Sequence, residues 1–220
     1  MAQLLRRAPM STPPPRRYDD IAPRAPEGEF ALASVLPGAG PLELDIGFGR
    51  GASVYERATL APGSRILAFE IKSKWAFKVA ERCEQRGYTH VRVLCGDVRE
   101  ILERTTDHAV VQQVSVHFPD PWWKRRHTKR RVVGDELLDA LARLMVDGGD
   151  FFVQTDVPDR AEIYVDTLRR HPDFELVGED GRIDENPFGA RSNRELRAVE
   201  DGLPIYRVLA KRVARALTPG

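Results

Sequence analysis

The chain has little cysteine, no long apolar run and almost no net charge. Its 220 residues include only Cys83 and Cys95, which form neither a disulfide framework nor a metal-binding spacing, so we expect a reducing, cytoplasmic environment. No segment approaches the ~18 consecutive apolar residues of a membrane span. The apolar stretch near the start is too short for a secretion signal. We therefore expect no membrane and no metal as partners.

Positive and negative side chains are nearly balanced over the chain. Lys and Arg total 34 and Asp and Glu total 33, so attraction to a polyanion would have to come from local clusters. Residues 1–28 hold six prolines and five arginines without apolar periodicity, and we predict a flexible basic tail there, either inert or helping to hold RNA. Residues 29–220 are predicted to form a single domain.

Strand-like and helix-like patterns alternate along this domain, which predicts an α/β fold with helices on both faces of a mostly parallel sheet. The last two strands lack a long crossover between them, which predicts an antiparallel hairpin at one edge. A polar loop without a clear helix is expected over 178–202. Strands are predicted at 41–48, 65–71, 91–97, 110–118, 151–155, 174–178 and 203–212, and helices near 52–58, 75–86, 137–145 and 158–170.

A glycine-rich turn, "LDIGFGRGAS", joins the first strand to the first helix. Gly47, Gly49 and Gly51 permit a tight turn and the close approach of a ligand. The stretch matches G-x-G-x-G, but Ala52 also lets it match the dinucleotide pattern G-x-G-x-x-A. The turn alone therefore indicates a nucleotide-type ligand but does not identify it. A glycine-rich turn that binds no ligand remains an alternative.

Three carboxylates at successive strand ends help to identify the ligand. Asp45, Glu70 and Asp97 lie at the carboxyl ends of the first three strands, and ligands of open parallel sheets lie over these ends. Glu70 suits ribose hydroxyls and Asp97 the adenine amino group. Asp45 would repel a pyrophosphate and attract an ammonium group. Together they favour S-adenosylmethionine over NAD, although any one of them alone is more simply a solvated strand-end acid.

The fourth strand leads into "HFPDPWWKRRHTKRR", residues 117–131. Pro119 and Pro121 stiffen the turn around Asp120. The two tryptophans offer faces for stacking a base, or they pack into the core. The cations Lys124, Arg125, Arg126, Lys129, Arg130 and Arg131 suit RNA phosphates.

This segment resembles the F-P-D-P-W-x-K-x-R-H-x-K-R-R signature of the tRNA (guanine-N7)-methyltransferases. "LDIGFGRG", "FEIKSKW", "LCGDVREIL", "QTD", "AEIYVDTL" and "ARSNRELRAVEDGLPIYRVLAKR" are similar to further family segments in the same order, over about residues 40–212. The resemblance implies a Rossmann-like S-adenosylmethionine-dependent methyltransferase fold and transfer of a methyl group to N7 of a guanine in the tRNA variable loop.

The resemblance also implies roles for single residues. Asp120 takes the catalytic position, and the cofactor contacts are Asp45, Gly47, Gly49, Glu70, Asp97 and Asp120. Substrate contacts are Lys124, Asp156, Ser192, Asn193, Arg194 and Glu195. Asp45 stands where the family usually has Glu, Ser192 replaces Thr, and Trp123 is bulkier than usual, so local geometry is expected to differ at these positions.

Other functions remain compatible with these residues. An S-adenosylmethionine-dependent methyltransferase could act on a small molecule or a protein, although the tryptophans and cations argue for RNA. An NAD-dependent oxidoreductase is disfavoured by Asp45. An RNA-binding protein without catalysis would not need acids at four strand ends. The expected partner is tRNA, with the protein a monomer or a homodimer.

Overall fold

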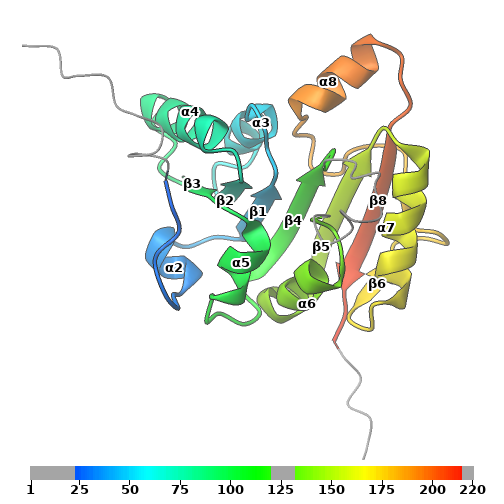
Figure 1. Cartoon of the computed structure of the whole chain (residues 1–220), viewed down its shortest axis with the longest axis horizontal. Helices are drawn as coiled ribbons and strands as arrows, with labels where there is room; N and C mark the ends of the chain where they lie inside the picture. Colours follow the sequence, from blue (N-terminus) through cyan, green and yellow to red (C-terminus); the bar gives the residue numbers. More distant parts are fainter. Residues whose placement is uncertain (1–22, 120–131, 215–220) are drawn as a thin grey trace, which may run out of the picture.

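The structure, a computed structural model, describes residues 23–119 and 132–214, which build one eight-stranded sheet with helices on both faces (Figure 1). The strand order is β3-β2-β1-β4-β5-β8-β6, and β7 pairs with β8. The first five strands in this order, β3, β2, β1, β4 and β5, pair in parallel. Strand β8 runs antiparallel to β5, β6 and β7. The mostly parallel sheet with an antiparallel edge is thus confirmed. The strands are β1 (Leu42–Ile46), β2 (Arg65–Glu70), β3 (Val91–Cys95), β4 (Val111–His117), β5 (Met145–Thr155), β6 (Phe174–Leu176), β7 (Arg182–Ile183) and β8 (Tyr206–Arg212).

Helices of the described residues cover both faces of the sheet. Helices α3 (Ala52–Leu60) and α4 (Ser73–Gln85) bury a small apolar cluster against β2 and β3. Helices α2 (Leu32–Val35), α5 (Val98–Glu103), α6 (Asp135–Leu144) and α7 (Pro158–Arg170) enclose the larger core on the opposite face. Within the described residues, no helix combines the length and apolar character needed to cross a bilayer.

Alternation along β1 sorts its side chains between the two faces. Leu44 and Ile46 enter the larger core, whereas Glu43 and Asp45 point to the other face and are also buried. Glu43 is held there by Arg57 of α3, with Nε–Oε2 and Nη2–Oε1 distances of 2.6 and 2.7 Å. The strand is therefore buried on both sides, as a central strand of a parallel sheet should be.

The expected polar loop over 178–202 contains regular structure. Strand β7 and helix α8 (Asn193–Glu200) both lie in it, so the expectation of a loop without a clear helix is wrong. Helix α5 also follows β3 where no helix was predicted. Both helices have a capping side chain at their start, Asp97 for α5 and Ser192 for α8. Neither has the long apolar stripe from which the other helices were predicted.

Part of the predicted tail lies against the domain. The backbone N–H of Cys95 donates to the Pro23 carbonyl oxygen, and the Arg104 guanidinium donates to the Gly28 carbonyl oxygen at 2.8 Å. Residues 23–28 are thus tied to β3 and α5, and residues 1–22 lie outside the described part of the chain.

Candidate functional site

The glycine turn between β1 and α3 needs glycine for its backbone geometry. Gly47, Gly49 and Gly51 have φ angles of 76°, 57° and 85°, values that side-chain-bearing residues rarely adopt. A Cβ on Gly51 would lie 2.5 Å from a methyl group of Val79, so this glycine also lets α3 and α4 pack closely. A Cβ on Gly47 or Gly49 would meet no atom within 4 Å. A ligand can therefore approach the backbone at these two positions.

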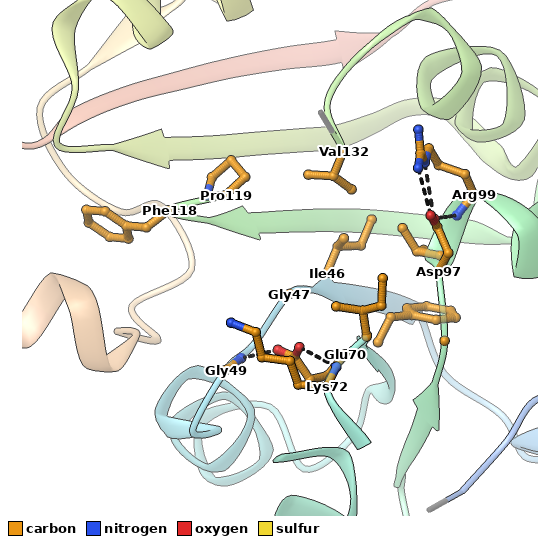
Figure 2. Close-up of a pocket in the computed structure, with 14 residues that line it drawn as sticks. Ile46, Gly47, Gly49, Glu70, Lys72, Asp97, Arg99, Phe118, Pro119 and Val132 are labelled. Atoms are coloured by element: carbon orange, nitrogen blue, oxygen red, sulfur yellow. Dashed lines mark hydrogen bonds and ion pairs between the residues drawn. The ribbon is translucent and has the colours of Figure 1, made fainter. Parts of the chain in front are cut away.

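Glu70 ties the end of β2 to this turn. Its Oε2 accepts a hydrogen bond from the Gly49 N–H and its Oε1 accepts one from the Lys72 N–H, both at 2.9 Å (Figure 2). The residue is only 7% exposed. Hydrogen bonds from backbone N–H groups to a carboxylate are among the stronger ones in proteins. Glu70 thus holds the glycine turn in place, and each of its oxygens keeps a lone pair for a further donor.

A cavity of about 550 Å³ opens beside the turn at the carboxyl ends of the first strands (Figure 2). Figure 2 shows two polar groups of residues in its wall, Glu70 with Lys72 and Asp97 with Arg99, and apolar side chains line the rest. Its lining residues are Ile46, Gly47, Gly49, Phe69, Glu70, Ile71, Lys72, Gly96, Asp97, Val98, Arg99, Phe118, Pro119 and Val132. A size of this order is typical of small-molecule sites.

Asp97 lies in this cavity but is already paired. Its Oδ2 accepts from Arg99 Nη2 at 2.7 Å, and its Oδ1 accepts from the backbone N–H and Nε of the same residue (Figure 2). The hydrogen bonds from Arg99 hold the pKa of the Asp97 carboxyl below its usual value, in spite of partial burial. Asp97 is therefore an anion at neutral pH, with its orientation set by Arg99.

Asp45 does not line the same cavity as Glu70 and Asp97, although one crevice was expected for all three. It lies on the opposite face of β1, where its Oδ2 accepts from the Ser53 hydroxyl at 2.7 Å. Its Oδ1 is buried and has no hydrogen-bond partner among the described residues. Burial raises the pKa of this carboxyl, and nearby His117 partly offsets the rise. Asp45 thus joins the end of β1 to the first turn of α3 from beneath the glycine turn.

The cavity is also lined by the two described residues that flank residues 120–131, where the predicted catalytic residue lies. Pro119, directly before this segment, and Val132, directly after it, line the cavity (Figure 2). Phe118 has a φ angle of 48°, an outlier for a bulky residue and a form of backbone strain that clusters at functional sites. The predicted residues of the segment lie outside the described part of the chain, namely Asp120, Lys124, Arg125, Arg126, Lys129, Arg130 and Arg131.

The predicted substrate residues beyond this segment lie together around the start of α8. Asp156, just after β5, forms an ion pair with Arg194 of α8, with an Nε–Oδ2 distance of 3.0 Å. Asn193 Oδ1 accepts from the N–H of Ala52, the first residue of α3, at 3.3 Å. Ser192 caps α8 by accepting from the Glu195 N–H. These contacts bring the loop after β5, the glycine turn and α8 to one rim.

Glu195 faces inward rather than toward that rim. It is 2% exposed, and its carboxylate accepts from Gln154 Nε2 at 2.7 Å and from Arg207 Nη2 at 3.1 Å. The Gln154 amide nitrogen also lies 2.8 Å from Nδ1 of His117, the last residue of β4. A buried polar chain therefore links α8, β5 and the strand that leads toward residue 120.

Several of these residues were not predicted from the sequence. Lys72 and Arg99 follow the predicted acids Glu70 and Asp97 by two positions each, and this repeated acid-x-cation spacing could have indicated them. His117 and Gln154 carry no such signal, because their contact depends on the register of β4 against β5.

Both the fold and the cavity suit S-adenosylmethionine. The apolar wall can hold adenine, Glu70 can accept from ribose hydroxyls, and the open space at Gly47 and Gly49 admits the rest of the molecule. A family model described as "Putative methyltransferase" matches residues 39–208. Similar folds occur in the 16S rRNA methyltransferase KamB, with a TM-score of 0.59 at 16% identity over 84% of this chain and 95% of that one. An S-adenosylmethionine-dependent O-methyltransferase from Thermotoga maritima has a TM-score of 0.54 at 18% identity, over 85% of this chain and 64% of that one. The chain is thus an S-adenosylmethionine-dependent methyltransferase.

Curated relatives narrow this class to one family. The tRNA (guanine-N(7)-)-methyltransferase of Synechococcus sp. (strain JA-3-3Ab) is 36% identical over 172 residues, 78% of this chain and 72% of that protein. The enzyme of the same name from Myxococcus xanthus (strain DK1622) is 34% identical over 181 residues, 82% and 85% of the two chains. The chain belongs to the tRNA (guanine-N7)-methyltransferase family.

Proposed function

We propose that this enzyme transfers the methyl group of S-adenosylmethionine to N7 of a guanine in the variable loop of tRNA. The observation that carries the proposal is the similarity to relatives of that name over more than three quarters of the chain. The cavity held by Glu70 and the glycine turn supports it, because these features suit the methyl donor. The protein acts in the cytoplasm, as a monomer or a homodimer.

Methyl transfer to guanine N7 needs little acid–base catalysis. Bound S-adenosylmethionine supplies an electrophilic methyl group on a sulfonium. Guanine N7 has an in-plane lone pair and no proton, so no general base is needed before it attacks. The enzyme's own contribution is to align the reactants and to stabilise the positive charge that develops on the purine.

Asp120 is the residue proposed to position the guanine or stabilise that charge. The lining of the cavity by Pro119 and Val132, which bracket the segment, supports this role. Asp120→Ala is expected to abolish methyl transfer while S-adenosylmethionine binding, measured by calorimetry, shows that the fold is retained. Near-normal turnover by this variant would contradict the catalytic role.

The remaining predicted residues divide between the methyl donor and the RNA. Gly47, Gly49, Glu70 and Asp97 are proposed to contact S-adenosylmethionine, and Asp45, on the other face of β1, to support the glycine turn through Ser53. Asp156, Ser192, Asn193 and Arg194 are proposed to hold the guanine and its neighbours, with Asp156 accepting from the guanine N1–H and amino groups. Glu195 was also expected to contact the substrate, but because it is buried we propose that it anchors α8 instead.

Lys124 and its arginine neighbours are proposed to contact the RNA backbone. Changing Arg125 and Arg130 to Ala is expected to weaken tRNA binding and to lower its salt dependence. A salt slope equal to that of the unchanged enzyme would exclude these two arginines from the contact.

The activity itself is tested with labelled methyl donor and unmodified tRNA. Transfer of label into tRNA, followed by chemical cleavage at 7-methylguanosine, is expected to give one cut within the variable loop. Label in RNA that is not cleaved there would instead indicate another methylated atom.

A further inference from the structure

Helix α4 presents a row of cations that no part of the cofactor cavity explains. Lys74, Lys78 and Arg82 follow one another at four-residue intervals, and Arg86 continues the row at the helix end. Residues four apart lie on one face of a helix. All four side chains are exposed. The row runs along about 18 Å at 1.5 Å per residue.

Two aromatic rings lie beneath this row. The Trp75 ring centroid lies 5.3 Å from Cζ of Arg50, 5.5 Å from Nζ of Lys74 and 5.7 Å from Nζ of Lys78. Trp75 is only half-buried. Farther along, Arg82 and Arg86 lie over the Tyr55 ring of α3, with Cζ–centroid distances of 5.7 and 4.6 Å. The rings gather the cations into one patch instead of leaving them spread through solvent.

These cations have no acidic partner within the described residues. The ion pairs formed there involve other residues, and none includes Arg50, Lys74, Lys78, Arg82 or Arg86. Like charges four residues apart on a helix repel one another. The repulsion within the patch is relieved when an external anion binds.

The patch continues to the rim of the cofactor cavity. Lys72, which lines the cavity, lies two residues before Lys74, and Arg50 directly follows Gly49 of the glycine turn. Figure 2 shows Lys72 beside Glu70 and Gly49 at this rim. A polyanion that reaches the cavity with one nucleotide can therefore lie with a neighbouring part along α4.

We infer that this α4 patch, Arg50, Lys74, Trp75, Lys78, Arg82 and Arg86, binds the sugar–phosphate backbone of the RNA substrate at a surface separate from residues 124–131. The inference rests on the proposed function, because it takes tRNA as the substrate. Charge complementarity favours RNA as the partner. The chain as a whole has a net charge of only +1, but this row of cations without acidic partners is locally complementary to the closely spaced phosphates of RNA.

The test compares two variants that each lose two exposed charges. Lys74→Gln with Lys78→Gln alters the patch, and Arg169→Gln with Arg170→Gln alters α7, which packs at the other end of the sheet (Figure 1). Binding of unmodified tRNA is measured by filter retention at several salt concentrations. A third variant, Lys74→Arg with Lys78→Arg, keeps the charge. S-adenosylmethionine binding confirms the fold of all three.

The patch variant is expected to bind tRNA about tenfold or more weakly at 0.15 M salt. Its slope of log K against log salt should fall by about 1.4 to 1.8, the loss for two phosphate contacts. The α7 and arginine variants should match the unchanged enzyme. An unchanged slope in the patch variant, or an equal loss in the α7 variant, would overturn the inference. Tight tRNA binding without N7 methylation by the unchanged enzyme would refute the proposed function and leave the patch standing.

Discussion

Glu70→Gln tests whether one carboxylate holds the cofactor turn. Glu70 accepts from two backbone N–H groups at 2.9 Å, one on each oxygen. A glutamine can accept with one oxygen only and turns its NH2 group toward the other N–H. The variant therefore loses a hydrogen bond to a charged group, worth about 1.5–3 kcal/mol, and leaves one of the two N–H groups without its acceptor.

This loss should appear in the affinity for the methyl donor. If the turn adopts its binding conformation only part of the time, the affinity falls by that fraction. A loss of about 1.5–3 kcal/mol corresponds to a dissociation constant roughly 10- to 100-fold higher, because each 1.4 kcal/mol is a factor of ten. Isothermal calorimetry with S-adenosylmethionine gives this ratio directly.

Glu43→Gln is the matched control. Glu43 is 4% exposed and Glu70 7%, but Glu43 pairs with Arg57 on the face of the sheet away from the cavity. This variant should unfold at a lower urea concentration while its affinity for S-adenosylmethionine stays unchanged. The reasoning fails if Glu70→Gln binds S-adenosylmethionine as tightly as the unchanged enzyme, or if Glu43→Gln loses as much affinity.

Three further variants test separate parts of the structure. Burial raises the pKa of Asp45, and an acid with a raised pKa costs stability as pH rises above its ordinary value of 3.8. Asp45→Asn should therefore increase the free energy of unfolding at pH 7, measured in urea titrations. Arg99 lowers the pKa of Asp97, which stabilises the folded protein above pH 3.8, and this stabilisation is lost in more acidic solution. Arg99→Gln should therefore lower the free energy of unfolding at pH 7 by about 1 kcal/mol or less. A difference from the unchanged enzyme that persists at pH 2 would refute this assignment. Glu195→Ala should destabilise the protein by about 3–5 kcal/mol, because it leaves Arg207 and the Gln154 amide without their buried acceptor, whereas Glu200→Ala, at an exposed position of the same helix, should change stability by less than about 0.5 kcal/mol.

The sheet was predictable because its central strands are short apolar runs that end at glycines or acids. The same runs predicted which residues lie at the carboxyl edge. They did not predict which side of the sheet each acid faces. Asp45 and Ile46 are neighbours on β1, yet Ile46 lines the cavity and Asp45 lies on the opposite face. That difference follows from strand alternation once the strand's exact start is known.

Helix α8 was missed because few apolar residues mark it. Its inward residue at the start is Glu195, whose burial depends on Gln154 and Arg207 from distant strands. The Ser192-x-x-Glu195 spacing does match a capping box and could have located the helix start.

The most direct test of the account is methyl transfer to tRNA in which the variable-loop guanine is replaced by 7-deazaguanine. This base keeps the Watson–Crick edge of guanine and replaces N7 with a carbon. We expect labelled methyl transfer to the ordinary tRNA and none to the substituted one, with both RNAs binding equally well. Equal labelling of both would contradict N7 methylation at this site.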